Sequence, residues 1–498
     1  MRTKKQNRRD FLKTSMMLTA GTVIPANFTN TIRMDPNKSS DVNRVIVVGA
    51  GLAGLACAYD LYQLNYNVIV LEARSRPGGR VCTYRDSFTD GLYAEMGAEY
   101  VDSGDKYLRK YCKDFGLKIL PAKQYDGVYV RGKRITMSDL ISGKVNLPFK
   151  GTMGGKLFAQ EAAYIQDWVK KVQNSDSLSQ EIQDLDNISV SEVLRMGGAP
   201  RDIIDLYTYT NGTESTTAPS RMSALKMVLA NSIASAFSEN TEEGRILGGN
   251  DQVPKKFAKV LGENIRYDRP IEKIEYNDHG VTIFFLENGK RQSISGSRCV
   301  LTLPVSILRS IKLNPSFSDS KMHCIRNQSY GHVMKIAMQY RKRFWDEPGS
   351  IGQRVFTDTT LRRVYHFSID QPGPRGILLS FTSGSDAKKL GRFNEQRRMT
   401  KAQKICTEIW KDTPKYWEGG VTKYWNKDPW LKASYSVAGV GQKDFREILA
   451  RPEGRFHFAG EHTSIYRASM NGAIESGIRT SKELSLIHIS EPTRRTPI

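Results

Sequence analysis

The stretch that decides the fold is Val45-Ile46-Val47-Val48, followed at once by Gly49-Ala50-Gly51-Leu52-Ala53-Gly54. Its first four residues form a continuous apolar run, as a strand buried in a parallel sheet requires. A helical pattern then continues to Leu64, and a second apolar strand, Asn67–Leu71, ends at Glu72. The order of strand, glycine-rich turn, helix and strand predicts a βαβ unit within an α/β fold.

Each glycine of this turn has its own physical reason. Gly49 allows the tight turn, Gly51 lets the backbone approach a pyrophosphate, and Gly54 packs the helix closely on the strand. The positive end of the helix then faces the anion. Glu72 follows Gly54 by eighteen residues and is placed to accept a hydrogen bond from a ribose hydroxyl. Together these features predict a dinucleotide site.

Composition narrows the class of protein. The 498 residues, of which 39% are hydrophobic and 25% charged, indicate a globular chain of two or three domains. No apolar run approaches the ~20 residues that span a bilayer, so we expect no stable membrane insertion. The six cysteines form no C-x-x-C pair, and we expect neither a disulfide framework nor a metal site. The net charge of +22 is dispersed, which favours a solvated basic surface over nucleic-acid binding.

The two ends of the chain carry separate signals. Residues 1–33 contain Arg8-Arg9-Asp10-Phe11-Leu12-Lys13 and then a short, weakly apolar stretch from Ser15 to Ile24. This pattern resembles a twin-arginine signal peptide, so we expect export of the folded protein by the twin-arginine machinery to the periplasm or beyond. Residues 484–498 resemble the translation of a sequencing-library adapter, and we expect a non-native tail without function there.

A second motif follows Glu72 directly, with the sequence Ala73-Arg74-Ser75-Arg76-Pro77-Gly78-Gly79-Arg80. It resembles the second flavin motif of the flavin-containing amine oxidases, a family that includes monoamine oxidases and L-amino acid oxidases. Guanidinium groups and the Gly-Gly backbone hold the FAD pyrophosphate in that motif. The resemblance covers about residues 43–483, and further segments carry it: Ala94–Glu99, Leu247–Val253, Arg269–Ile274, Phe458–Thr463 and Met470–Gly477.

The resemblance implies FAD as the cofactor, which we expect to be non-covalent because of a departure at Ser434 given below, and a particular set of cofactor-binding residues. These are Gly49, Ala50, Gly51, Ala53, Gly54, Glu72, Ala73, Arg74, Gly79, Arg80, Met96, Gly97, Ala98, Glu99, Ile271, Trp425, Glu461, Ser469, Met470 and Ala473. A helix N-terminus at the closing motif would stabilise charge on the reduced flavin. His462 is interpreted as a structural hydrogen-bonding residue rather than a base.

The fold that the resemblance implies is a Rossmann-like FAD-binding domain built from separated segments, with a mixed-sheet substrate domain and a helical insertion. We assign residues 42–100, 236–310 and 446–483 to the FAD-binding domain. Residues 101–150 and 311–445 are assigned to the substrate-binding domain, and residues 151–235 to the insertion, in which apolar residues recur at helical spacing.

Three residues are candidates for the chemistry. The family pattern places a lysine at Lys335, hydrogen-bonded through water to flavin N5, where apolar surroundings would suit it to handle water or dioxygen. Trp425 and Tyr435 match the tryptophan beside the isoalloxazine ring and one aromatic residue of the substrate cage. Aromatic faces there would orient an amine. Trp430 is expected to line the same cavity.

The sequence also departs from the family pattern. Ser434 stands where covalent members have a cysteine, so no thioether to FAD can form there. The second cage aromatic is replaced by Ser469, which opens one wall of the cage. Amino acid oxidases hold the substrate carboxylate with an arginine and a tyrosine, and the matching positions here are Glu99 and Phe381. A carboxylate at position 99 would repel an amino acid and favour a cationic group.

The resulting expectation is an FAD-dependent oxidase of primary amines or diamines. It would transfer hydride from the amine α-carbon to flavin N5 and reduce O2 to H2O2. An L-amino acid oxidase of the same fold is the alternative, and a flavin-dependent C–C desaturase or a flavin-bearing protein without turnover are more distant ones. The particular amine stays open, as does the oligomeric state, with a homodimer one option.

Overall fold

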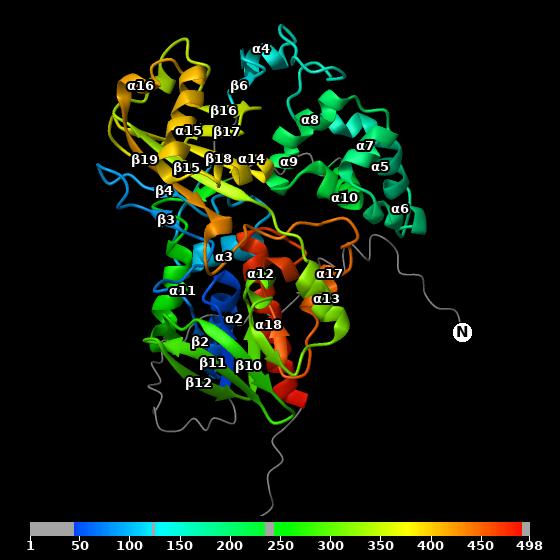
Figure 1. The fold of residues 1–498 in the computed structure, drawn as a ribbon, viewed down its shortest axis with the longest axis vertical. Helices are drawn as coiled ribbons and strands as arrows, with labels where there is room; N and C mark the ends of the chain where they lie inside the picture. Colours follow the sequence, from blue (N-terminus) through cyan, green and yellow to red (C-terminus); the bar gives the residue numbers. More distant parts are fainter. Residues whose placement is uncertain (1–43, 122–124, 235–243, 491–498) are drawn as a thin grey trace, which may run out of the picture.

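The computed structural model describes residues 44–121, 125–234 and 244–490. The predicted export signal and most of the adapter-like tail lie outside these ranges. Within them, no helix is long and apolar enough to cross a membrane. The molecule has two halves: the glycine-rich turn lies in the lower half of Figure 1, and a large sheet with a separate group of helices lies above it.

The lower half is organised around a five-stranded sheet in which every pairing is parallel. The predicted βαβ unit lies at its centre, because β1 pairs with β2 on one side and with β13 on the other. The order is β20 (Phe456–Phe458), β13 (Arg298–Leu301), β1 (Arg44–Val48), β2 (Asn67–Leu71) and β9 (Ile265–Arg266).

Alternation along the central strands gives the parallel sheet two apolar faces. Val45 and Val47 face one core, and the neighbouring Ile46 and Val48 face the other. Four helices pack on the first face: α2 (Leu52–Gln63), α3 (Lys106–Asp114), α11 (Gln252–Leu261) and α18 (Met470–Ser490). A second sheet covers the other face, in the order β12 (Lys290–Gly296), β11 (Val281–Glu287), β10 (Ile271–Tyr276) and β14 (Lys312–Asn314), together with α13 (Asp319–Asn327) and α17 (Phe445–Ala450).

The upper half contains a seven-stranded mixed sheet. One face packs against α14 (Gly384–Leu390) and α15 (Glu395–Ile409), and the other faces the 92–96 segment of the lower half. The order is β19 (Trp417–Tyr424), β15 (Val333–Tyr340), β18 (Gly376–Ser383), β17 (Arg363–His366), β16 (Arg354–Thr357), β6 (Gly127–Val130) and β7 (Lys133–Thr136). The predicted mixed sheet and parallel sheet are both present.

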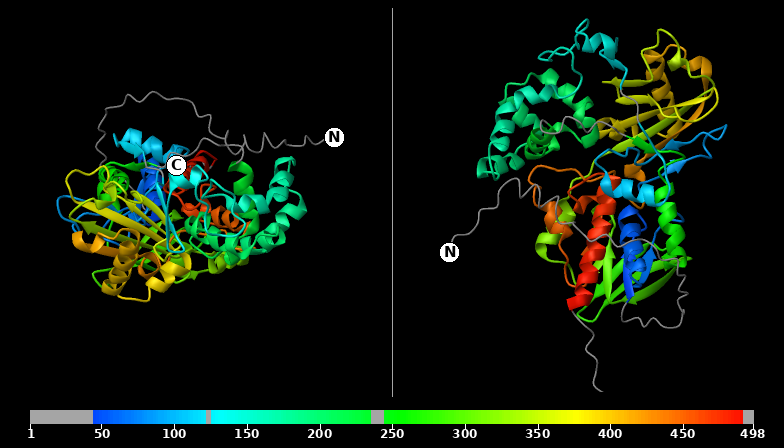
Figure 2. Two further views of the ribbon diagram at one scale, coloured as in Figure 1. Left: turned by 90° about the horizontal axis from the view of Figure 1, so that it is seen from above. Right: turned by 180° about the vertical axis from the view of Figure 1, so that it is seen from behind.

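A group of helices with its own apolar core stands beside this sheet, as Figure 2 shows from above and behind. Its members are α5 (Gln166–Gln173), α6 (Gln180–Asp184), α7 (Val190–Met196), α8 (Arg201–Tyr209), α9 (Asn211–Ser215) and α10 (Ala224–Ala234). This group is the helical insertion predicted from residues 151–235. Ser189 is the N-cap residue of α7. Its hydroxyl accepts from the backbone N–H of Glu192, and the Glu192 carboxylate accepts from the backbone N–H of Ser189, which forms a capping box.

Two segments lie elsewhere than the sequence assignment placed them. Helix α3, assigned to the substrate domain, packs on α2 and α18, because Leu108, Tyr111 and Cys112 complete the core of the lower half. Strand β14 and helix α13, also assigned there, belong to the lower half since β14 pairs with β10. Helix α18 continues into the adapter-like residues, and Leu484 is buried in the same core.

Candidate active site

Two adjoining cavities lie where the halves meet, one of about 260 Å³ and one of about 320 Å³. We call the first the dinucleotide cavity, since it is lined by the glycine-rich turn, the 72–80 segment and the start of α18. We call the second the substrate cavity, since it lies between the 97–102 segment and strands β15 and β18. Six residues line both: Arg80, Ala98, Tyr435, Ala468, Ser469 and Met470.

Most of the predicted cofactor residues line the dinucleotide cavity. They are Gly49, Gly51, Ala53, Glu72, Ala73, Arg74, Gly79, Arg80, Ala98, Ile271, Glu461, Ser469, Met470 and Ala473. Gly97, Glu99 and Trp425 line the substrate cavity instead. Ala50, Gly54 and Met96 lie in neither lining.

The backbone around Gly51 leaves room for a diphosphate. A Cβ atom added at Gly51 would meet nothing within 4 Å, whereas one at Gly54 would lie 2.0 Å from the Gly49 carbonyl oxygen. Helix α2 begins after Gly51 with no side-chain cap and no acidic residue in its first turn. No capping side chain therefore accepts from the first N–H groups of the helix. These groups remain available to an anion in the cavity. These residues fit the diphosphate of FAD.

Glu72 is fixed at the end of β2. Its two carboxylate oxygens accept from the backbone N–H groups of Ala50, at 2.7 Å, and Arg74, at 2.9 Å. Burial raises the pKa of this carboxyl, while the two backbone donors act in the opposite direction. A carboxylate offers about four acceptor sites, so both oxygens keep capacity for a ribose hydroxyl.

The two predicted arginines of the second motif are held by carboxylates. Arg74 pairs with the buried Asp428, and Arg80 donates to Glu461 Oε1 at 2.8 Å and to the Ser434 carbonyl at 2.7 Å. Burial would raise the pKa of Glu461, but Arg80, His462 and Ser436 together lower it to about 2. Burial lowers the pKa of His462 to about 4. The low pKa makes His462 a weak base, but its Nδ1 atom is buried without a hydrogen-bond partner among the described residues, so the expected hydrogen-bonding role is not seen at that atom.

The substrate cavity contains a buried ion pair. Lys335 Nζ donates to Glu99 Oε2 at 2.5 Å, and Tyr365 OH donates to the same oxygen at 2.6 Å. Strand alternation explains this placement, because Lys335 shares a face of β15 with Ala337, which packs toward the 92–96 segment. Burial raises the pKa of Tyr365 well above its usual value, so its phenol stays a donor.

This pairing corrects two sequence expectations. Lys335 was expected in apolar surroundings, but its side chain is paired with the Glu99 carboxylate. Glu99 was expected to repel a substrate carboxylate, but Lys335 offsets its charge. Both side chains are at most 5% exposed. Nothing in the local sequence around either residue identified the other, because 236 positions separate them.

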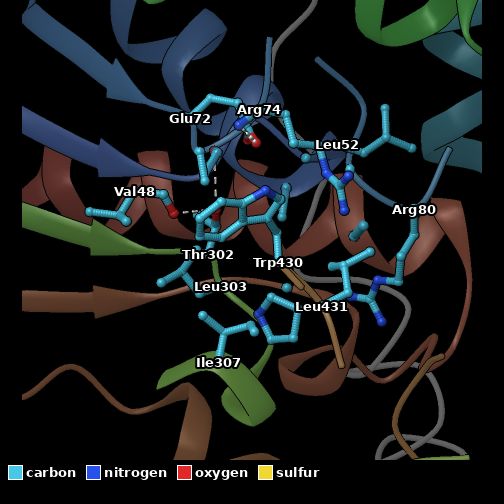
Figure 3. A pocket seen from close by; sticks show the side chains of 18 of the residues that line it. Val48, Leu52, Glu72, Arg74, Arg80, Thr302, Leu303, Ile307, Trp430 and Leu431 are labelled. Carbon is cyan, nitrogen blue, oxygen red and sulfur yellow. Dashed lines mark hydrogen bonds between the residues drawn. The ribbon is translucent and has the colours of Figure 1, made fainter. Parts of the chain in front are cut away.

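The predicted aromatic residues are divided between the cavities. Trp425 and Phe381 line the substrate cavity, Tyr435 lines both, and Phe381 stands directly opposite Lys335 in the β15–β18 register. Trp425 Nε1 donates to the Met96 carbonyl at 2.8 Å, which fixes the indole against the 94–99 segment. Trp430, expected in the substrate cavity, lines only the dinucleotide cavity, where Figure 3 shows it among Glu72, Arg74 and Leu303.

Ser469 lines both cavities, but its hydroxyl is engaged in hydrogen bonds with the backbone. Its hydroxyl donates to the Tyr466 carbonyl at 2.7 Å and accepts from Gly472 N at 2.9 Å, so it caps the start of α18. The hydroxyl oxygen of Ser434 is buried and has no hydrogen-bond partner among the described residues. No cysteine is among the described residues that line either cavity.

Sequence reasoning missed several residues of the site. Thr302 follows β13, and its hydroxyl donates to the Val48 carbonyl at 2.7 Å beneath the glycine-rich turn. The apolar strand that precedes Thr302 could have indicated that it lies at the edge of the parallel sheet. Asp102, Asp105 and Glu214 line the substrate cavity with no comparable signal. Glu214 comes from α9 of the helical insertion, and Tyr435 OH donates to its carbonyl oxygen at 2.5 Å.

The family profile described as "Flavin containing amine oxidoreductase" matches residues 52–485. The chain belongs to this family. Its relatives include YobN of Bacillus subtilis (strain 168), whose name assigns it provisionally to the L-amino-acid oxidases; it is 29% identical over 91% of this chain and 97% of that protein. An L-amino-acid oxidase of Siganus canaliculatus is 28% identical over 89% of this chain and 85% of that protein.

Solved structures of two amine oxidases share the fold. Putrescine oxidase bound to putrescine superposes with a TM-score of 0.75 at 22% identity, over 89% of this chain and 99% of that one. Cyclohexylamine oxidase from Brevibacterium oxydans IH-35A gives a TM-score of 0.75 at 20% identity over the same shares. The chain is thus a flavin-dependent oxidoreductase with an amine oxidase fold. Within its described residues no cluster of metal ligands is present.

Proposed function

We propose that this flavoprotein oxidises primary amines or diamines, with dioxygen as the electron acceptor. The observation that carries the proposal is the charge of the substrate cavity. Four carboxylates line it, from Glu99, Asp102, Asp105 and Glu214, against two cations, from Arg80 and Lys335. Both cations are paired, with Glu461 and Glu99 respectively. A substrate carboxylate would therefore enter without a partner cation, which is costly in a desolvated site.

An amine carries the opposite charge and suits this lining. The side chain of Glu214 is half exposed and paired with the buried Arg363, so its carboxylate lies at the boundary between cavity and solvent. A second ammonium group on a diamine would be attracted to this side of the cavity. The aromatic rings of Trp425, Phe381 and Tyr435 offer faces that favour the amine nitrogen.

When bound, FAD supplies the acceptor for a hydride from the substrate α-carbon and returns the electrons to dioxygen as H2O2. The chain's own residues position the reactants. The 94–99 segment and Trp425 are locked by the indole hydrogen bond, which fixes one wall of the cavity. Lys335 and Tyr365 hold Glu99 and present a buried ammonium beside Phe381, 5.1 Å from Lys335 Nζ to the ring centre. The ammonium is the positive end of this ion pair, and that end would favour negative charge that develops beside it during electron transfer.

Matched substrate pairs test this proposal. Butylamine and norvaline differ by one carboxylate, as do 1,4-diaminobutane and ornithine. We expect kcat/KM, measured by coupled peroxide release, to be at least tenfold higher for each amine than for its amino acid. A higher value for the amino acids would show that a carboxylate clamp exists, and the L-amino acid oxidase alternative, which the sequence relatives favour, would replace the proposal.

The same proposal includes non-covalent FAD. It is supported by Ser434 and by the lack of cysteines around the two cavities among the described residues. Acid precipitation of the holoenzyme should release all flavin absorbance into the supernatant. Flavin that stays with the precipitated protein would contradict it.

We also propose export by the twin-arginine route. Its support is the order of residues from Arg8 to Lys13 in the sequence. Changing Arg8→Lys and Arg9→Lys together should leave the FAD-loaded protein in the cytoplasm. Periplasmic recovery of the double variant would show that the two arginines are not an export signal.

A further inference from the structure

One short segment joins the two cavities. It leaves the end of β19 through Trp425, which lines the substrate cavity, and continues through Pro429 to Lys432, which line the dinucleotide cavity. We call residues 425–432 the bridging loop. Its last residue, Lys432, has a φ of 53°, a left-handed conformation that turns the chain back toward Ser434 and Tyr435. A single loop thus presents one indole to each cavity.

The second of these indoles has no stacking partner in the part of the chain that the structure describes. Trp430 is 38% exposed, although it lies in a concave cavity rather than on the outer surface. Among the described residues no aromatic ring and no cation packs on its face. In Figure 3 its indole projects into the space between Glu72 and Arg74 on one side and Leu303 and Ile307 on the other. A large planar ring in such a position is ready to pack on a flat ligand.

A buried carboxylate holds the bridging loop in place. Asp428 is 3% exposed. Its Oδ1 atom accepts from the Arg74 guanidinium and, at 3.1 Å, from the backbone N–H of Trp430, while Oδ2 accepts from Lys423 Nζ at 2.7 Å. Asp428 therefore ties Trp430 to the arginine-containing segment that forms the opposite wall of the dinucleotide cavity.

We propose that Trp430 is a cofactor-binding residue that packs on the nucleotide portion of bound FAD, and that Asp428 is the positioning residue that holds it there. The nucleotide portion is the relevant part because Glu72, the expected ribose ligand, and Ile307 flank the indole. The proposal rests on the assignment of FAD to the dinucleotide cavity and is independent of which amine is the substrate.

Release of FAD from the holoenzyme tests the proposal without relying on turnover. After dilution, recovery of flavin fluorescence should be at least tenfold faster for Trp430→Ala than for the unchanged protein, and less than threefold faster for Trp430→Phe, which keeps a flat ring. Asp428→Asn should accelerate release by severalfold, because the loop loses part of its anchor. Trp417→Phe is the matched control, since Trp417 packs against Tyr340 at the far end of β19 and should release FAD at the normal rate.

A second readout covers the case in which a variant folds poorly. Bound FAD should quench indole fluorescence, and Trp430→Phe should lose a larger part of that quenching than Trp417→Phe. Normal release from Trp430→Ala together with unchanged quenching in Trp430→Phe would overturn the proposal. A changed KM for amines in Trp430→Ala, with FAD release unchanged, would also overturn it. That result would show that Trp430 contacts the substrate and not the cofactor. Absence of bound FAD in the unchanged protein would instead contradict the cofactor assignment and the proposed function together.

Discussion

The two cavities are built by different means. The dinucleotide cavity is organised around backbone features: a glycine-rich turn, two helix N-termini and the Gly78–Gly79 turn line it, and its charged side chains are mostly paired. The substrate cavity is formed by side chains from separate elements, among them Lys335 of β15 and Glu214 of α9. Backbone geometry fixes the shape of the first, and pairing of charges decides the selectivity of the second.

The largest effect is expected where a side chain would fill the backbone-built cavity. Gly51→Val places its methyl groups in open space within the dinucleotide cavity, so the fold should survive while FAD affinity falls at least a thousandfold. Equilibrium dialysis and a thermal melt measure the two effects. Gly419→Val is the control, because a Cβ there also meets nothing within 4 Å but lies on β19 outside both cavities. Normal FAD affinity in Gly51→Val would refute a diphosphate at this turn.

A change confined to the substrate cavity should leave FAD affinity intact and instead lower turnover and stability. Lys335→Met should retain FAD but lower turnover more than tenfold. It should also destabilise the fold by about 3 kcal/mol, because Glu99 is left buried without its cation. Turnover and urea unfolding measure these effects.

Adding Glu99→Gln to Lys335→Met separates the two roles of the lysine. The double variant should recover most of the lost stability, since no buried charge remains, while turnover stays low. If turnover recovered with stability, Lys335 would have only a structural role.

A smaller effect is expected at a buried carboxyl that lines neither cavity. Glu95 precedes the 96–99 segment, accepts from Thr83 and from Asn250 N, and has its pKa raised to about 7 by burial. Because the folded state keeps this proton to higher pH than the unfolded state does, stability should fall as pH rises from about 4.5 to about 7 and then level off.

Glu95→Gln removes this titration. Between pH 5 and pH 8 the unchanged protein should lose on the order of 2 kcal/mol more unfolding free energy than the variant. Urea unfolding of both proteins at the two pH values gives the difference. Parallel losses would mean that the Glu95 carboxyl ionises in the folded protein as easily as in the unfolded one.

The sequence predicted the backbone-built cavity much better than the other. The run from Val45 to Glu72 specified strand, turn, helix and strand within one local segment, and the structure contains them in that order. The local motif, however, did not show that Arg74 would be engaged by Asp428, 354 positions away.

The substrate cavity could be predicted only in part, because its properties depend on contacts between distant elements. Lys335, Trp425, Tyr435 and Phe381 were identified through the family resemblance, and all four line the cavity. The pairing of Lys335 with Glu99, and the contribution of Glu214 from the helical insertion, follow from how the two halves pack. The family pattern identified Lys335 but not what its side chain contacts.

The central claim is that the substrate cavity holds no cation for a carboxylate, because Glu99 engages Lys335. Glu99→Gln in the FAD-loaded enzyme tests it most directly, since the ammonium of Lys335 would then lack its buried partner. The ratio of kcat/KM for ornithine to that for 1,4-diaminobutane should rise at least tenfold in the variant, with the unchanged enzyme as reference. An unchanged or lower ratio would contradict the claim.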